Sequence, residues 1–304
     1  MSQFPSYLEQ FRSFCFQNEP KNIEQAIEYF SVFGGMGWRV NMQDPLELII
    51  KEKLLNNYRY IHGDITKITQ SNNIHHSLLT KLATGDRREH SAFKNARVSR
   101  NEGEESIDFL VDNDLLDREK SQDKPMNKDE EVSDKLIFTL PFMRFWFASI
   151  SPYYKGIKEG EFDEFEKNYL NTQQNFSDFI YERLILALIK KNFQEDRLTN
   201  IGSYWDKKTD IDILGKTQSG KIVVGTFKLS KSKAKKSELT KLKEKCATAQ
   251  INADIFIVFS KNGFTSELKK EKNENVKLLS MKNLNTLIEN LIPSDLIENT
   301  NKKY

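Results

Sequence analysis

Cysteine is scarce in this sequence. Cys15 and Cys246 are the only two among 304 residues, and no CxxC spacing joins them. This scarcity argues against a disulfide scaffold and against a zinc site built on thiolates, and it favours a reducing compartment. The sequence also lacks the basic start and apolar run of a signal peptide, so we expect a cytoplasmic protein.

Long apolar runs and nucleotide-binding motifs are missing as well. No stretch approaches the length of a membrane span, so no membrane partner is expected. No GxxxxGK(S/T) segment is present, which excludes ATP binding through that loop. A single dominant charge is also lacking, because 46 basic residues oppose 44 acidic ones and leave a net charge of +2. Any contact with nucleic acid must therefore come from local patches.

Helical periodicity is the main feature of residues 1–70. Apolar residues recur at helical spacing over 5–16 and 23–33, and Gly34 and Gly35 stop the second helix. A third helix is predicted to begin at Asp44 as its N-cap, with Pro45 in the first helical position. We therefore expect a helical N-terminal region.

Residues 71–140 have the pattern of a winged helix-turn-helix. Helices are predicted over 72–84, 90–98 and 104–116, with wing strands at 115–120 and 135–140 and a mobile polar tip between them. The third helix occupies the recognition position, yet it is acidic, and carboxylates repel phosphates. Its acidic residues are Glu102, Glu104, Glu105, Asp108, Asp112 and Asp114. We expect this face to contact a protein partner, with backbone contacts from Lys94, Arg97 and Arg100 as the alternative.

An aromatic connector covers residues 141–170. Phe142, Phe145 and Trp146 recur at helical spacing, which favours a buried helix over an exposed platform for stacking bases. Tyr153 and Tyr154 follow Pro152 and are expected at the surface end of this segment.

A predicted hairpin organises the C-terminal half of the chain. Strands are expected at 201–205, 211–216 and 221–230, with a polar turn over 217–220 that ends in glycine. Alternation places Asp210 and Asp212 on one face of the second strand, and Thr226 and Lys228 on one face of the third. Two carboxylates near a lysine suit a Mg²⁺ or Mn²⁺ ion, which can activate water for phosphodiester cleavage.

This arrangement resembles the PD-(D/E)XK nuclease signature. The resemblance places Asp212 at the first metal-binding acid and Lys228 at the family's lysine, while Thr226 stands where the second acid belongs. It further implies that Glu182, on the strong apolar helix 176–193, points at the metal; the alternative is a surface glutamate paired with Arg183 or Lys190. Asp210 lies on the same face as Asp212, two residues before it, and is expected to replace the missing acid in part. The metal ligands would be Asp212, Asp210 and Glu182, and Lys228 would complete the catalytic set.

The fold implied for residues 171–295 is an α/β domain of the restriction-endonuclease type, a mixed sheet flanked by helices. A lysine-rich helix is predicted directly after the third strand, and it is suited to a phosphate backbone. Its proposed nucleic-acid contacts are Lys231, Lys233, Lys235, Lys236 and Lys241. Further strands are expected at 254–260 and 276–280, then a closing helix over 281–292 and a flexible tail at 296–304.

The aromatic run supplies a second resemblance. Pro141-Phe142-Met143-Arg144-Phe145-Trp146-Phe147, after a winged helix and before a nuclease-like domain, is similar to a family of unknown function found at the C-terminus of archaeal-type AAA ATPases. Leu140 replaces the Asp common in that family, and the ATPase module is missing. Two functions follow as hypotheses: a weak or degenerate Mg²⁺-dependent DNA endonuclease, and a non-catalytic module that binds DNA or protein.

Overall fold

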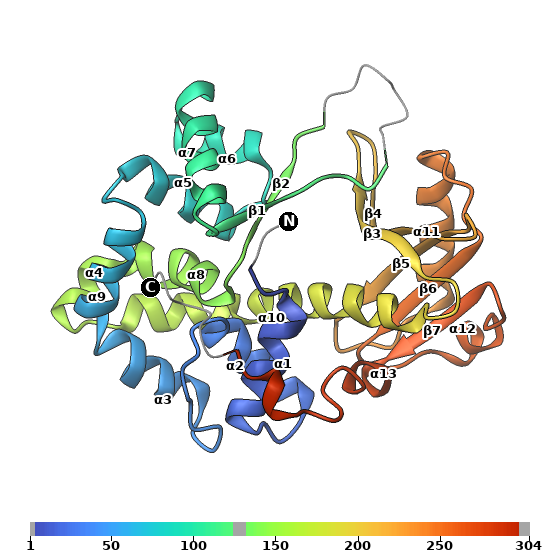
Figure 1. Ribbon diagram of the computed structural model, residues 1–304, viewed down its shortest axis with the longest axis horizontal. Coiled ribbons are helices and arrows are strands. Elements are labelled where there is room, and N and C mark those ends of the chain that lie inside the picture. Colours follow the sequence, from blue (N-terminus) through green and yellow to red (C-terminus); the bar gives the residue numbers. More distant parts are fainter. Residues whose placement is uncertain (1–3, 124–131, 298–304) are drawn as a thin grey trace. The chain divides into compact units, whose positions relative to one another are not determined.

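The computed structural model describes residues 4–123 and 132–297, and its longest helix is α10 (Asp163–Asn192) (Figure 1). The chain divides into two compact units. Unit 1 comprises residues 1–119, 133–180 and 290–304, and unit 2 comprises residues 120–132 and 181–289. The domain boundaries given above stay a prediction, and the predicted tail lies outside the described residues from position 298 onward.

The start of unit 1 is helical, as its periodicity predicts. Its elements are α1 (Tyr7–Asn18), α2 (Ile23–Phe33), α3 (Leu46–Ile50), a π-helix (Lys51–Leu55) and α4 (Tyr58–Ile68). Ser6 begins α1 with a capping box, in which its hydroxyl accepts from Glu9 N and the Glu9 carboxylate accepts from Ser6 N. The short 3₁₀ helix Pro293–Asp295 lies against α1, where Asp295 pairs with Arg12 at 2.7 Å.

The prediction that Asp44 caps the third helix is wrong. Pro45 occupies the N-cap position of α3, and no side chain caps it. The Asp44 carboxylate instead accepts a hydrogen bond from Asn41 Nδ2 at 2.8 Å, while its carbonyl accepts one from Tyr29 Oη. Asn41 of the loop and Tyr29 of α2 therefore engage both acceptors of Asp44.

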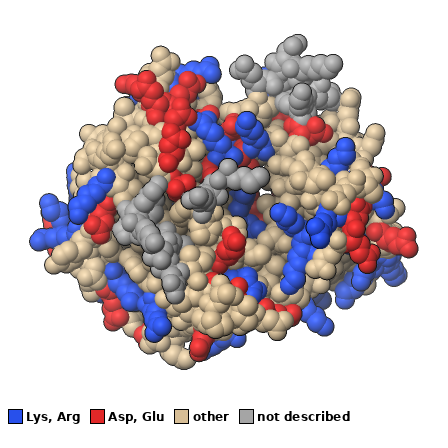
Figure 2. All heavy atoms as spheres, in the orientation of Figure 1, with Lys and Arg blue, Asp and Glu red and all other residues tan. Residues whose placement is uncertain are grey.

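Three helices and an antiparallel strand pair follow in unit 1. They are α5 (Asn73–Thr84), α6 (Glu89–Ala96), α7 (Arg100–Asp112), β1 (Leu116–Glu119) and β2 (Lys135–Phe138). Helix α5 packs on both α6 and α7, and Arg118 of β1 reaches back to pair with Glu89 at 2.6 Å and Asp108 at 2.5 Å. Figure 2 shows acidic side chains gathered over α7, where Glu102, Glu105, Asp108 and Asp112 are exposed.

Two histidines of α5 hold the end of α4. His75 Nδ1 lies 3.0 Å from the Thr69 carbonyl, and its ring stacks on Phe109 of α7 at 4.5 Å. His76 Nε2 lies 2.5 Å from Thr69 Oγ1, and its ring meets Phe147 edge-on. Burial lowers the pKa of His76, and the neighbouring charges of His62 and His75 lower it further. Both histidines therefore have structural roles in the packing of α4, α5 and α7.

The lowered pKa of His76 predicts a loss of stability in acid. The unfolded chain binds more protons than the folded one just below the ordinary histidine pKa of about 6.5. The stability contributed by neutral His76 is thus complete above that pH and is lost as pH falls through its folded pKa. Urea unfolding of the wild type and of His76→Gln between pH 7.5 and 5.5 measures this. The difference in free energy of unfolding between the two proteins should become smaller in acid. A difference that stays constant from pH 7.5 to 5.5 would contradict the prediction.

The aromatic segment forms a broken helix that is buried. It consists of α8 (Pro141–Phe145), a π-helix (Trp146–Ile150), a 3₁₀ turn (Ser151–Tyr153) and α9 (Tyr154–Glu159). Phe142, Phe145 and Trp146 are each at most 1% exposed, whereas Tyr154 is 45% exposed. The prediction of a core segment with a surface end is therefore confirmed.

Unit 2 contains a five-stranded mixed sheet with flanking helices. Its strands are β3 (Leu198–Trp205), β4 (Asp210–Thr217), β5 (Ile222–Lys228), β6 (Ile255–Ser260) and β7 (Val276–Ser280), in that order across the sheet. The first three are antiparallel, and β6 and β7 run parallel to β5. The β4–β5 turn ends at Gly220 with φ of +91°, a left-handed conformation that favours the glycine found there.

Helices cover both faces of this sheet. On one face, Leu239, Leu242 and Cys246 of α11 (Lys236–Thr248) pack on the strands, and Leu268 of α12 (Ser266–Lys270) joins them. Val276 packs on that face, so the next residue, Lys277, points to the other, where it lies 4.3 Å from the Phe193 ring that follows α10. The predicted closing helix is shorter than expected, because α13 spans only Met281–Asn285.

The edge of β3 is partly covered by the segment that follows β1. Trp205 N donates to Ser121 Oγ at 3.0 Å, and Gln122 N donates to the Ser203 carbonyl at 3.0 Å. The start of the predicted mobile tip is therefore attached to the sheet, and residues 124–131 lie outside the described residues.

Within residues 4–123 and 132–297, none of the helices has the length and apolar character needed to cross a membrane.

Candidate functional site

The predicted hairpin exists, and it brings Asp212 and Thr226 together. Ile213 pairs with Gly225 across β4 and β5, so the same register sets Asp212 opposite Thr226. Thr226 Oγ1 donates a hydrogen bond to Asp212 Oδ2 at 2.6 Å. The position where the nuclease signature has a second acid thus holds a hydroxyl that occupies one oxygen of the first.

Asp212 is half-buried, and burial raises the pKa of its carboxyl. The negative charge of Asp210 raises that pKa further, whereas the Thr226 hydrogen bond and the positive charge of Lys245 lower it. The carboxylate form therefore depends on the hydroxyl and the ammonium beside it.

Helix α11 supplies an opposite charge to each of the other predicted strand residues. Lys245 Nζ lies 3.4 Å from Asp210 Oδ1, and Glu238 Oε1 lies 3.3 Å from Lys228 Nζ. Both pairs lie on the sheet face that α11 covers. On the sheet face that carries Asp210, Asp212 and Lys228, charged side chains of the strands therefore lie beside oppositely charged side chains of α11.

Glu182 has a different environment. It lies on α10, which covers the other face of the sheet, and its carboxylate accepts a hydrogen bond from Arg183 Nη2 at 2.9 Å. Among residues 4–123 and 132–297, no group of three or more His, Cys, Asp or Glu side chains is arranged to hold a metal ion. As placed, Glu182 does not complete a three-ligand group with Asp210 and Asp212.

Asp210 and Asp212 already have polar partners within the protein. Mg²⁺ takes hard oxygen ligands and usually keeps several waters, so one or two carboxylates can suffice. Here, however, one oxygen of Asp212 accepts from Thr226, and Asp210 faces an ammonium. A Mg²⁺ or Mn²⁺ ion at Asp210, Asp212 and Glu182 stays a prediction.

The lysine-rich segment differs from the predicted helix. Helix α11 begins only at Lys236, so Lys231, Lys233 and Lys235 lie in the loop between β5 and α11, all exposed. Lys236 pairs with Glu271 at 2.6 Å, and Lys241 is exposed on α11. Three of the five predicted nucleic-acid contacts therefore lie on the loop and two on the helix.

Hydrogen bonds tie this loop to the one that follows β6. Asn262 Nδ2 donates to the Ser230 carbonyl at 2.9 Å, and Ala234 N donates to the Gly263 carbonyl at 2.9 Å. Lys261 N donates to the Lys228 carbonyl at 3.0 Å. The two loops lie at the carboxyl ends of the parallel strands β5 and β6, the edge where ligands bind in open α/β sheets.

Sequence reasoning missed Glu238, Lys245 and Asn262. Glu238 and Lys245 lie in the lysine-rich segment, and nothing in its sequence distinguishes Lys245 from the neighbouring lysines. Only the apolar spacing of Leu239, Leu242 and Cys246 indicates which side of the helix faces the sheet.

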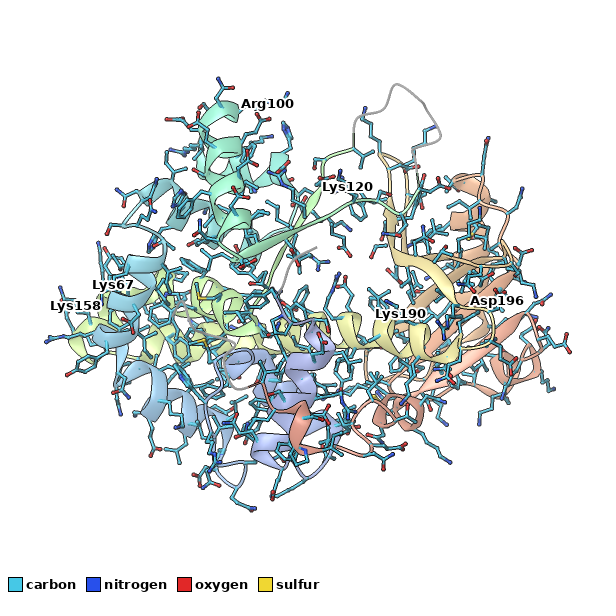
Figure 3. The ribbon with its side chains drawn as sticks, in the orientation of Figure 1. Lys67, Arg100, Lys120, Lys158, Lys190 and Asp196 are labelled. Carbon is cyan, nitrogen blue, oxygen red and sulfur yellow. The ribbon has the colours of Figure 1, made fainter. Side chains whose placement is uncertain are left out.

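A cavity of about 770 Å³ also opens in unit 2. It lies where α10 ends and where β6 and β7 begin, and Phe193, Asp196, Lys221, Ile255 and Lys277 contribute to its lining. Lys190 and Asp196, labelled in Figure 3, mark the end of α10 and the turn into β3. Asp196 accepts from Ser219 N and Oγ, and charges of both signs line the cavity, so its chemistry selects no ligand class.

Comparison with known proteins adds a partial match. Residues 146–240, from the π-helix of the aromatic segment to the start of α11, match the family DUF234, described as archaeal and bacterial proteins of unknown function. This match supports a relationship with an uncharacterised family over that stretch. No curated protein and no solved structure matches the chain.

Proposed function

We propose that this protein associates with nucleic acid through a nuclease-like domain in unit 2 whose metal-dependent cleavage is weak or lost. The order of elements supports the domain: α10, the antiparallel strands β3 to β5, α11, and then β6 parallel to β5. This is the order that the PD-(D/E)XK resemblance implies. Asp212 and Lys228 stand at the motif positions on neighbouring strands.

The proposal that cleavage is weak or lost rests on the hydrogen bond from Thr226 to Asp212. A second acid at this position would give a metal ion two adjacent carboxylates, whereas a threonine hydroxyl donates a hydrogen bond to the first. The site then has one carboxylate fewer with which to attract a divalent cation.

Helices α5 to α7 with strands β1 and β2 form, on this proposal, a winged helix that contacts protein. The exposed carboxylates of α7 oppose a phosphate backbone, and Arg118 and Arg100 are already paired with Asp108 and Glu104. Nucleic acid is instead assigned to the loop lysines of unit 2.

Salt-dependent binding tests the assignment. Replacing Lys231, Lys233 and Lys235 with alanine should weaken binding of duplex DNA by about tenfold or more at moderate salt, and should reduce the slope of log K against log salt by about 0.9 for each lost phosphate contact. Fluorescence anisotropy with labelled DNA in EDTA measures both quantities.

The control has the same change in net charge. Lys53, Lys155 and Lys158 are exposed lysines of unit 1, and their triple alanine variant should keep the wild-type affinity and slope. Equal losses in the two triple variants would contradict a specific loop site. No binding of the wild type at low salt would favour a protein-only role.

A slow active nuclease is the second candidate, favoured by the retention of Asp212 and Lys228 on adjacent strands. A metal ion bound there would supply electrostatic stabilisation of the leaving oxygen and activation of water. Lys228 would orient that water or neutralise developing phosphate charge. Cleavage of DNA in Mg²⁺ or Mn²⁺ that is lost in both Asp212→Ala and Lys228→Ala would establish this candidate, and cleavage that survives in both would remove it.

A further inference from the structure

The two aspartates of β4 each have a partner inside the protein. Asp210 faces Lys245 of α11, with Oδ1 and Nζ 3.4 Å apart, and Asp212 accepts the Thr226 hydrogen bond at 2.6 Å. The charge of Lys245 acts on Asp212 as well as on Asp210. One ammonium group thus interacts electrostatically with two carboxylates, which alternation places on the same face of β4.

The packing of α11 determines where this ammonium lies. Leu242, Cys246 and Ala249 are buried against β4 and β5, which sets the rotation of the helix about its axis. Glu238 and Lys245 are two turns apart on α11 and therefore project from the same side of it. Glu238 reaches Lys228 at the end of β5, and Lys245 reaches Asp210 at the start of β4. Both charges thus come from a helix whose position the core maintains.

We propose that Lys245 is the resident cation of the Asp210–Asp212 pair and takes the place of the divalent metal ion that a nuclease-like sheet would hold there. An ammonium beside the carboxylates satisfies part of their charge and repels an incoming cation. Lysine is suited to this task, because its ammonium is a compact point charge on a flexible stem. The absence of a three-ligand metal group among the described residues agrees with this assignment.

This inference rests on the proposed nuclease-like account of unit 2, but it does not require nucleic acid. Its test uses metal alone, so its failure is distinct from a failure of DNA binding. Lys245→Met keeps the apolar stem and removes the charge. In the full chain, this variant should bind Mn²⁺ about tenfold or more tightly than the wild type, in titration calorimetry and in metal-induced shifts of Tm.

Three further variants separate the outcomes. Lys241→Met makes the same charge change at an exposed position of α11 and should leave Mn²⁺ affinity at the wild-type value. Adding Asp210→Asn to Lys245→Met should remove the gain. If Lys245→Met fails to fold, Lys245→Arg, which keeps the charge, should fold and bind Mn²⁺ as weakly as the wild type. Tight binding by the wild type, or an equal gain in Lys241→Met, would overturn the proposal.

Discussion

Replacing Trp146 with alanine should lower the free energy of unfolding of unit 1 by about 3–5 kcal/mol, the usual result of removing a large buried aromatic side chain. Trp146 is 1% exposed. Its ring stacks on Tyr58 of α4 with centroids 5.6 Å apart and planes 6° apart, and Phe142 lies 6.1 Å from it. Truncation therefore leaves a cavity between α4 and the aromatic segment that these rigid rings cannot fill.

Urea unfolding monitored by circular dichroism measures the loss. Tyr154→Ala is the matched control, because this aromatic residue of the same segment is 45% exposed and should cost far less. DNA affinity of both variants is measured under conditions where they are folded. A Trp146→Ala protein that keeps its stability but loses DNA binding would contradict the core assignment and would favour the platform for stacking bases.

The sheet of unit 2 could be predicted because its signals are local. A polar turn ending in glycine, period-two alternation and a continuous apolar run identify β4, β5 and β6 within a few residues of their bounds. The apolar composition of the helix at 176–193 likewise predicts burial, and Leu184, Ile185, Leu188 and Ile189 are all at most 1% exposed. Short-range patterns of this kind depend on the chain itself and little on its surroundings.

The partners of the site residues could not be predicted, because they depend on how distant elements meet. Lys245 reaches Asp210 across 35 positions of sequence, a pairing set by the rotation and axial position of α11 on the sheet. The error at Asp44 has the same origin, because Tyr29 and Asn41 engage that residue from outside the helix it was expected to cap. Tertiary contacts override local preference in both places.

Thr226→Glu should destabilise unit 2 by about 2 kcal/mol or more in EDTA at neutral pH. The change removes the hydroxyl that donates to Asp212 Oδ2, and it places a second carboxylate beside a half-buried one. Burial already raises the pKa of Asp212, so a like charge directly opposite makes its ionised form less favourable still. A Mg²⁺ or Mn²⁺ ion would relieve this repulsion, and saturating metal should therefore restore much of the lost stability.

Thermal and urea unfolding of Thr226→Glu with and without Mn²⁺ measure both effects, and nicking of plasmid DNA reports whether cleavage returns. Thr226→Val is the control, since it removes the hydrogen bond without adding charge and should show a loss of about 1 kcal/mol with no response to metal. Adding Asp212→Ala to Thr226→Glu should abolish the metal response, because the carboxylate directly opposite position 226 is then gone. A Thr226→Glu protein as stable as the wild type in EDTA and indifferent to Mn²⁺ would show that positions 212 and 226 do not share a cation site, and unit 2 would then be a binding scaffold.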